Sequence, residues 1–230
     1  MIQFLKNKGG KMKIRDIMTW DVVSVSSDTP IMEARKIMNA HSVRRLPVVD
    51  KGKLVGMISR DGITRASPSP ASSLSVWEIN YLLAKMTVKD IMSKNLVTVS
   101  PDMTVESAVA LAQNKGVGAL PVVEDRTLVG IVTTDDFFYK ILNPMLGIGR
   151  PGVRLLIHNC GTPKCIQQIM EIMDVMEVVG QKKVKILSVH TMPTADGEQP
   201  ELVLHLDNAD PAKIIKVLAD SGFAAEVRER

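Results

Sequence analysis

Aromatic residues and cysteine are scarce in this sequence. Phe, Trp and Tyr make up 3% of the 230 residues, whereas Met alone occurs 14 times. The hydrophobic core must therefore be built from aliphatic side chains and Met, and few side chains are available to stack on nucleic-acid bases. Two cysteines do not provide the disulfide framework of a small secreted protein.

Long hydrophobic runs are also missing. No apolar stretch approaches the roughly 18 residues that a membrane helix needs. The first residues, MIQFLKNKGGKMKIRDIM, contain neither the apolar segment nor the cleavage site of a signal peptide. These absences predict a cytoplasmic protein with no membrane partner.

Neither the charge nor the motifs favour nucleic-acid binding or catalysis. The formal net charge of +4 at pH 7 is spread along the chain, so a mild surface excess is the simpler interpretation and nucleic acid is not an expected partner. The sequence contains no P-loop, Rossmann fingerprint, HExxH motif or recognisable pair of nucleophile and base. It predicts a protein that is not an enzyme and requires no cofactor.

An internal repeat with an offset of 74 residues organises the first two thirds of the chain. Pro47 and Pro121 differ by 121 − 47 = 74, and Gly56 and Gly130 by 130 − 56 = 74. Three blocks share this register without a gap: Asp16–Met18 with Asp90–Met92, Leu46–Val49 with Leu120–Val123, and Leu54–Gly56 with Leu128–Gly130. The simplest interpretation is two copies of one structural unit.

Each copy is predicted to fold in the order β-α-β-β-α. In the first copy the elements are a strand over 22–25, a helix after Thr29-Pro30, hairpinned strands over 46–50 and 54–59, and a helix over 61–65. In the second copy they are a strand over 96–99, a helix after Thr104, strands over 120–124 and 128–133, and a helix over 135–142. One copy is too small to bury its sheet alone, so the two should pack about a pseudo-two-fold axis.

The remaining segments are a connector and a separate C-terminal unit. The Pro/Ser-rich residues 67–73 lead into an amphipathic helix over 74–84. The predicted elements after residue 146 are strands over 153–158, 184–190, 201–206 and 225–228, with helices over 163–179 and 211–220. The order βαββαβ is typical of a ferredoxin-like domain, and the whole chain is predicted to be of the α/β class.

The duplicated pattern resembles a tandem pair of CBS motifs over residues 13–145. The residues that carry the resemblance are DIMT, VVSV, LPVVD and LVGMIS with their second copies DIMS, LVTV, LPVVE and LVGIVT. The connector RASPSPASSLSVWEINYLLAKMTVKDIM is similar to that of the acetoin utilization protein AcuB group, whose members end in an ACT domain. The resemblance implies an N-terminal extension (1–12), a first CBS motif (13–73), a linker helix (74–86), a second CBS motif (87–145) and an ACT-like domain (146–230).

The resemblance implies adenine-nucleotide binding between the two motifs. The family element Gly-h-h-Ser/Thr-x-x-Asp, in which h is a hydrophobic residue, matches Gly130, Thr133 and Asp136. The hydroxyl would contact phosphate, and the carboxylate would accept hydrogen bonds from the ribose hydroxyls. In the first copy Ser59 takes the hydroxyl position, but Gly62 replaces the aspartate and Asp61 lies one residue early. The same pattern also forms a helix cap without any ligand.

Arg44 and Arg45 match basic positions that contact phosphates in some CBS proteins. Their counterparts in the second copy are Gly118 and Ala119. The two arginines and the Thr133/Asp136 element could therefore serve one ligand or two half-sites. A solvated surface pair of arginines is the alternative.

Cysteines and histidines of the ACT-like domain allow two interpretations. Cys160 and Cys165 flank the loop after the first predicted strand, and His158, His190 and His205 lie on predicted strands. A metal or redox site is one interpretation. Free buried cysteines and ordinary strand histidines are the other, because the spacing matches no zinc motif.

We therefore expect a regulatory protein that senses AMP, ADP, ATP, S-adenosylmethionine or a related ligand in the CBS cleft. It would signal through domain packing or to a regulated partner protein. The alternatives are a structural homodimerisation module that binds no ligand and a nucleic-acid-binding regulator. The resemblance also implies a homodimer formed through the CBS pair, the ACT-like domain or both.

Overall fold

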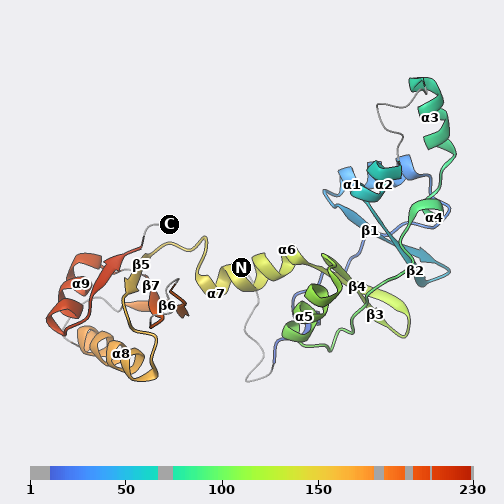
Figure 1. Ribbon diagram of the computed structural model, residues 1–230. Coiled ribbons are helices and arrows are strands. Elements are labelled where there is room, and N and C mark those ends of the chain that lie inside the picture. The colour runs from blue at the N-terminus through green and yellow to red at the C-terminus, as the bar shows by residue number, and fades with distance from the viewer. Residues whose placement is uncertain (1–10, 67–74, 179–183, 195–198, 208, 229–230) are drawn as a thin grey trace. The chain divides into compact units, whose positions relative to one another are not determined.

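The computed structural model describes residues 11–66, 75–178, 184–194, 199–207 and 209–228. The chain forms two compact units, residues 1–137 and 138–230, whose helices and strands are labelled in Figure 1. Most of the expected N-terminal extension and the whole 67–73 connector lie outside the described residues. Within the described ranges, none of the helices has the length and apolar character that crossing a bilayer requires.

The first unit contains two copies of one hairpin with flanking helices. The first copy has η1 (Ile14–Asp16), α1 (Ile31–Ala40), β1 (Arg45–Asp50), β2 (Lys53–Ser59) and α2 (Arg60–Ala66). After α3 (Val76–Lys85) the second copy has α4 (Val88–Ile91), α5 (Val105–Lys115), β3 (Ala119–Glu124), β4 (Thr127–Thr133) and α6 (Thr134–Phe137). Both hairpins are antiparallel, and both shift register at the same point, between Val48 and Val49 and between Val122 and Val123. The repeat predicted from sequence is therefore a repeat in backbone structure.

The apolar helix faces are buried as the sequence pattern predicts. Ile31, Ala34 and Met38 of α1 are fully buried against Leu46, Val48 and other residues of the first hairpin. In α5 the buried positions are Val105, Ala108 and Ala112. Aliphatic side chains and Met supply these contacts, because the unit has few aromatic residues to bury.

Each copy pairs its leading segment with the hairpin of the other copy. The backbones of Thr19 and Ile131 exchange two hydrogen bonds of 2.9 and 3.0 Å, and those of Met57 and Ser93 do the same. A methionine accompanies each bridge: Met18 packs on Gly130, and Met92 packs on Gly56. A Cβ atom at Gly130 would lie 2.6 Å from the Met18 sulfur, so the close approach requires glycine. The two copies form one interlocked unit.

Two sequence expectations for this region are wrong. Residues 22–25 and 96–99 are not strands, because each makes a single parallel bridge, Val25 with Val48 and Val99 with Val122, before the chain turns into the next helix. The expected helix over 135–142 ends at Phe137 and continues as the π-helical turn η2 (Phe138–Leu142) and then α7 (Asn143–Leu146). Pro144 has no N–H to continue an α-helical ladder, which explains the change in geometry.

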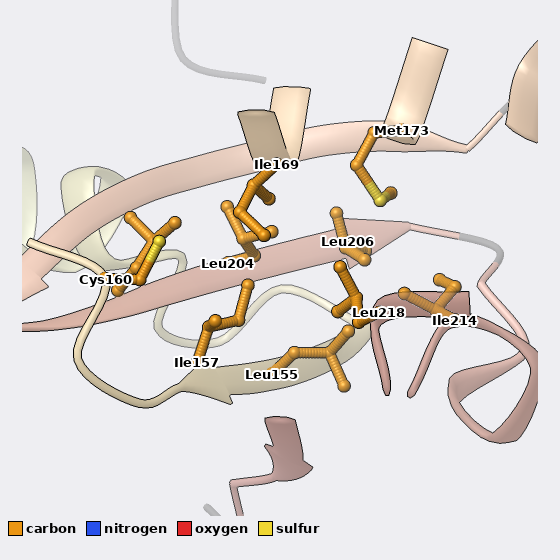
Figure 2. Packing of buried hydrophobic residues seen from close by; sticks show 10 residues of the cluster. Leu155, Ile157, Cys160, Ile169, Met173, Leu204, Leu206, Ile214 and Leu218 are labelled. Atoms are coloured by element: carbon orange, nitrogen blue, oxygen red, sulfur yellow. The ribbon is translucent and has the colours of Figure 1, made fainter. Parts of the chain in front are cut away.

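The second unit has a four-stranded antiparallel sheet. Its elements after α7 are β5 (Val153–Ile157), α8 (Pro163–Val178), β6 (Lys185–Met192), β7 (Glu201–Asp207), α9 (Pro211–Asp220) and β8 (Ala225–Val227). The strand order is β6-β7-β5-β8. Leu155 and Ile157 of β5 and Leu204 of β7 point toward Ile169 and Met173 of α8 in the buried core (Figure 2). The two helices therefore cover one face of the sheet.

The cysteines of this unit are not free. Cys160 and Cys165 form a disulfide with their Cα atoms 5.3 Å apart, so the expectation of free buried cysteines is wrong. The loop that leads into α8 brings the two side chains together, which the spacing of five residues permits. His158 lies 3.1 Å from Glu201, and His205 is buried. Among the described residues, no group of three or more His, Cys, Asp or Glu side chains could hold a metal ion.

Candidate functional site

A cavity of about 270 Å³ lies in the first unit and is formed by both copies of the repeat. The first copy contributes its leading segment and the start of β1, and the second copy contributes the end of β4 and the start of α6. The lining residues are Thr19, Asp21, Val22, Val23, Ser42, Val43, Arg44, Arg45, Pro47, Ile131, Thr133, Thr134, Asp135 and Asp136. The cavity thus combines apolar side chains with five charged ones.

Thr133 and Asp136 form a closed hydrogen-bonded cap at the edge of this cavity. The Asp136 carboxylate accepts hydrogen bonds from the Thr133 backbone N–H (2.8 Å) and hydroxyl (2.7 Å). The Asp136 N–H donates to the Thr133 hydroxyl at 3.4 Å. This arrangement fixes the first turn of α6 and presents a hydroxyl and a carboxylate at one point of the cavity wall.

The same cap occurs elsewhere in the unit. The Asp90 carboxylate accepts hydrogen bonds from the Thr87 backbone N–H (2.8 Å) and hydroxyl (2.9 Å), and these hydrogen bonds lower the pKa of Asp90. Neither Thr87 nor Asp90 lines the cavity. The cap at Thr133 and Asp136 is therefore distinguished by its position in the cavity wall and not by its geometry.

The first copy forms only half of this cap. The Ser59 hydroxyl accepts a hydrogen bond of 3.0 Å from the Gly62 N–H, but residue 62 has no side chain to return one. Ser59 and Asp61 do not line the cavity. Gly130 does not line it either, since it pairs with Val122 and packs against Met18. The structure thus separates these three sequence candidates from the other four.

The two arginines come to the cavity from the start of β1. Nη2 of Arg44 lies 3.0 Å from Oδ2 of Asp135, which joins the two copies across the cavity. A Cβ atom at Gly118 would lie 3.3 Å from the Arg45 guanidinium, so Arg45 occupies the space beside the residue that corresponds to Arg44. The sequence alternatives of one shared site or two half-sites are thus resolved in geometric terms: both arginines and the Thr133/Asp136 cap line one cavity.

Some cavity residues lie outside the sequence candidates. Thr19, Asp21, Val22 and Val23 reach the cavity because Thr19 pairs with Ile131 of the other copy. No local sequence signal marks such a partner 131 − 19 = 112 residues away. Asp135 stands beside the family element and could have been singled out as a charge next to Asp136.

Comparison with known proteins identifies the first unit. The model of the CBS domain matches residues 14–69 and 88–143. The CBS domain-containing protein YhcV of Bacillus subtilis is 32% identical over 123 residues, which cover 54% of this chain and 81% of that protein. An L-aspartate semialdehyde sulfurtransferase of Methanocaldococcus jannaschii is 34% identical over 127 residues, or 54% of this chain. The match spans only 22% of that enzyme, so the likeness concerns the CBS pair.

Solved structures show the same pair. A putative acetoin utilization protein, AcuB, from Vibrio cholerae has 26% sequence identity and a TM-score of 0.50, with 58% of this chain and 93% of that chain covered. Two further CBS pairs, with TM-scores of 0.46 and 0.49, were crystallised with S-adenosylmethionine and 5′-methylthioadenosine in one case and with AMP in the other. From the duplicated sequence, the duplicated backbone and the matches over both copies, the chain belongs to the CBS domain-containing proteins and carries a tandem CBS pair.

Proposed function

We propose that this protein is a non-catalytic sensor that binds one adenine nucleotide, or a related adenosyl ligand, in the cavity of its CBS pair. The observation that carries the proposal is that Thr133 and Asp136 of the second copy and Arg44 and Arg45 of the first line a single cavity. A carboxylate, a hydroxyl and guanidinium groups around one hollow are the groups that bind a ribose and a phosphate.

The cavity assigns a part of the ligand to each group. Asp136 would accept hydrogen bonds from the ribose hydroxyls, and Thr133 and Arg44 would donate hydrogen bonds to a phosphate. Val22, Val23 and other apolar lining residues offer a surface for the flat faces of adenine. The volume of about 270 Å³ lies just below the roughly 300 Å³ at which pockets for drug-sized molecules begin, so it favours a single mononucleotide over a dinucleotide.

The second unit would receive or pass on the signal. Its βαββαβ order and strand order β6-β7-β5-β8 support the ACT-like assignment, and with it the similarity to the AcuB group. We propose a cytoplasmic homodimer that acts on a partner protein. Ligand binding changes the equilibrium between conformations only to the extent that the ligand prefers one of them.

Thermal unfolding with adenine nucleotides tests the proposal. AMP, ADP, ATP and S-adenosylmethionine are added in turn to the wild type, to Asp136→Ala and to Asp90→Ala. The Asp90→Ala variant is the matched control because it removes the same cap away from the cavity. Both variants should unfold at a lower temperature without ligand, since each loses a helix cap.

The variants should then separate when ligand is added. A nucleotide at a hundred times its Kd stabilises the wild type by about 2.7 kcal/mol. Asp90→Ala should keep this increment and Asp136→Ala should lose most of it. If no adenosyl compound shifts the wild type, the CBS pair does not sense these ligands, and a structural homodimerisation role takes its place.

A further inference from the structure

The ion pair between Arg44 and Asp135 lies within the proposed binding cavity and consists of one residue from each CBS copy. Arg44 precedes β1, and Asp135 lies in the first turn of α6, beside Asp136. The equivalent of Asp135 in the first copy is Asp61, because 135 − 61 = 74. Asp61 does not line the cavity and Arg44 has no equivalent in the second copy, where the residue is Gly118. This ion pair therefore exists on one side of the pseudo-two-fold only.

The charges of the cavity wall are unfavourable for a ligand with several phosphates. Arg44 and Arg45 supply two positive charges, and Asp21, Asp135 and Asp136 supply three negative ones, so the sum is 2 − 3 = −1. A phosphate that reaches Arg44 meets a guanidinium that already holds a carboxylate. Its negative charge must displace Asp135 and then remain close to it.

The ion pair is of the kind that a ligand can displace. The side chains of Arg44 and Asp135 are 66% and 56% exposed, and exposed pairs of this type contribute little to the stability of the folded chain. The bidentate geometry between arginine and phosphate is stronger than a single contact with a carboxylate. Exchange of one partner for the other therefore leaves the surrounding fold unchanged.

We infer that Asp135 determines specificity by competing with the ligand phosphate for Arg44, so that the cavity prefers adenosyl ligands of low negative charge, such as AMP, over ATP. This inference rests on the proposed function, since it concerns a ligand in the same cavity. In the free protein Asp135 holds Arg44. In the complex a phosphate oxygen takes that place and Asp135 turns toward solvent.

Calorimetric titration of adenosine, AMP and ATP at one ionic strength tests the inference. Asp135→Asn keeps the size of the side chain and removes its charge. It should tighten AMP binding about fivefold, the effect of one unit charge at about 4 Å in a water-like dielectric. It should tighten ATP binding by a larger factor and leave adenosine binding unchanged. Asp61→Asn, the matched control in the other copy, should change none of the three.

A double-variant cycle separates competition from a general field effect. If Asp135 competes for Arg44, Asp135→Asn should no longer tighten AMP binding in an Arg44→Gln background. An equal gain in both backgrounds would show that Asp135 acts through its charge alone, and the competition would be disproved. An unchanged ratio of AMP to adenosine affinity in Asp135→Asn overturns the inference while the proposed function stands. If neither compound binds wild type or variant, the proposed function fails and the inference fails with it.

Discussion

The two CBS copies have the same backbone and different site residues. Their hairpins share one register, down to the shift after Val48 in the first and after Val122 in the second. The residues that face the cavity are not shared, because Arg44 corresponds to Gly118 and Asp136 corresponds to Gly62. The comparison teaches that packing constrains both copies equally, whereas each copy supplies a different half of one binding site.

The copies also differ in how their first helices begin and end. In α5 the Thr104 hydroxyl accepts a hydrogen bond from Ser107, and Gly116 ends the helix in the left-handed conformation with φ 63°. In α1 the corresponding cap is Pro30, which offers no side-chain acceptor, and Ser42 takes the place of the glycine at φ 53°. The second copy therefore has the better local signals for the same helix.

The largest expected effect tests whether the two cores are equivalent. Leu46 and Leu120 occupy the same strand position and both are fully buried. Leu46→Ala and Leu120→Ala should each destabilise the first unit by about 2–5 kcal/mol, through lost burial and the cavity that remains. Chemical denaturation measures both. A difference of more than about 1.5 kcal/mol between them, roughly a third of that range, would break the equivalence of the two cores.

A smaller effect is expected from exchanging the helix ends. Gly116→Ser should destabilise the protein by about 1 kcal/mol, because a residue with a Cβ is strained at φ 63°. Ser42→Gly should stabilise it by a similar or smaller amount, since it relieves the same strain at φ 53°. Thermal unfolding of both variants checks the signs. Opposite signs sharpen the comparison of the copies, and equal signs contradict it.

The half-formed cap of the first copy can be completed. Gly62→Asp would give α2 the carboxylate that Asp136 gives α6, and it should stabilise the protein by about 0.5–1 kcal/mol. The nearest atom to the new Cβ is the Ser59 hydroxyl oxygen at 3.3 Å, on a side chain that can adjust. Denaturant titration gives the stability, and calorimetry with AMP should show unchanged binding. A second bound nucleotide would mean that the missing aspartate alone disabled a second site.

The pH dependence of stability should distinguish the CBS pair from the C-terminal unit. Hydrogen bonds from Ser27 lower the pKa of Asp50, and those from Thr87 lower the pKa of Asp90, below the ordinary value of 3.8. The unfolded chain therefore binds these protons first, so this stability is present above about pH 3.8 and is lost as the pH falls further.

In the C-terminal unit the corresponding group is a histidine. Burial, followed by the positive charges of Arg228 and Arg154, lowers the pKa of His190 below 6.5. The unfolded chain takes up this proton first, so the stability is present above pH 6.5 and is lost as the pH falls through the lowered pKa. Calorimetric scans should show the C-terminal transition falling first on acidification. His190→Gln should remove the early fall, and the exposed His41→Gln should not.

Much of the repeat architecture can be predicted because it depends on local rules. The turn at residues 51–53 and the apolar faces of α1 and α5 each occur in one register, and the hairpins lie where that register places them. Residues 22–25 have the same β-rich composition but pair at one residue only. Composition indicates an extended backbone, whereas the length of a strand depends on the partner available to it.

The candidate site is only partly readable from sequence for a related reason. Arg44, Arg45, Thr133 and Asp136 can be picked out by their types and by the repeat, and they line one cavity. The contribution of residues 19–23 cannot be read locally, because it arises from pairing with Ile131 in the other copy. The ion pair of Arg44 with Asp135 likewise depends on how the two copies are docked.

The exchange of leading segments between the copies has a consequence for synthesis. Met57 pairs with Ser93, which leaves the ribosome 93 − 57 = 36 residues later, whereas Thr19 waits 131 − 19 = 112 residues for Ile131. At bacterial or eukaryotic elongation rates of about 5–20 residues per second, the first delay is about 2–7 s and the second about 6–22 s. The first hairpin can therefore complete its packing on the nascent chain well before the segment that begins the CBS pair. That segment, although translated early, is among the last to reach its native place.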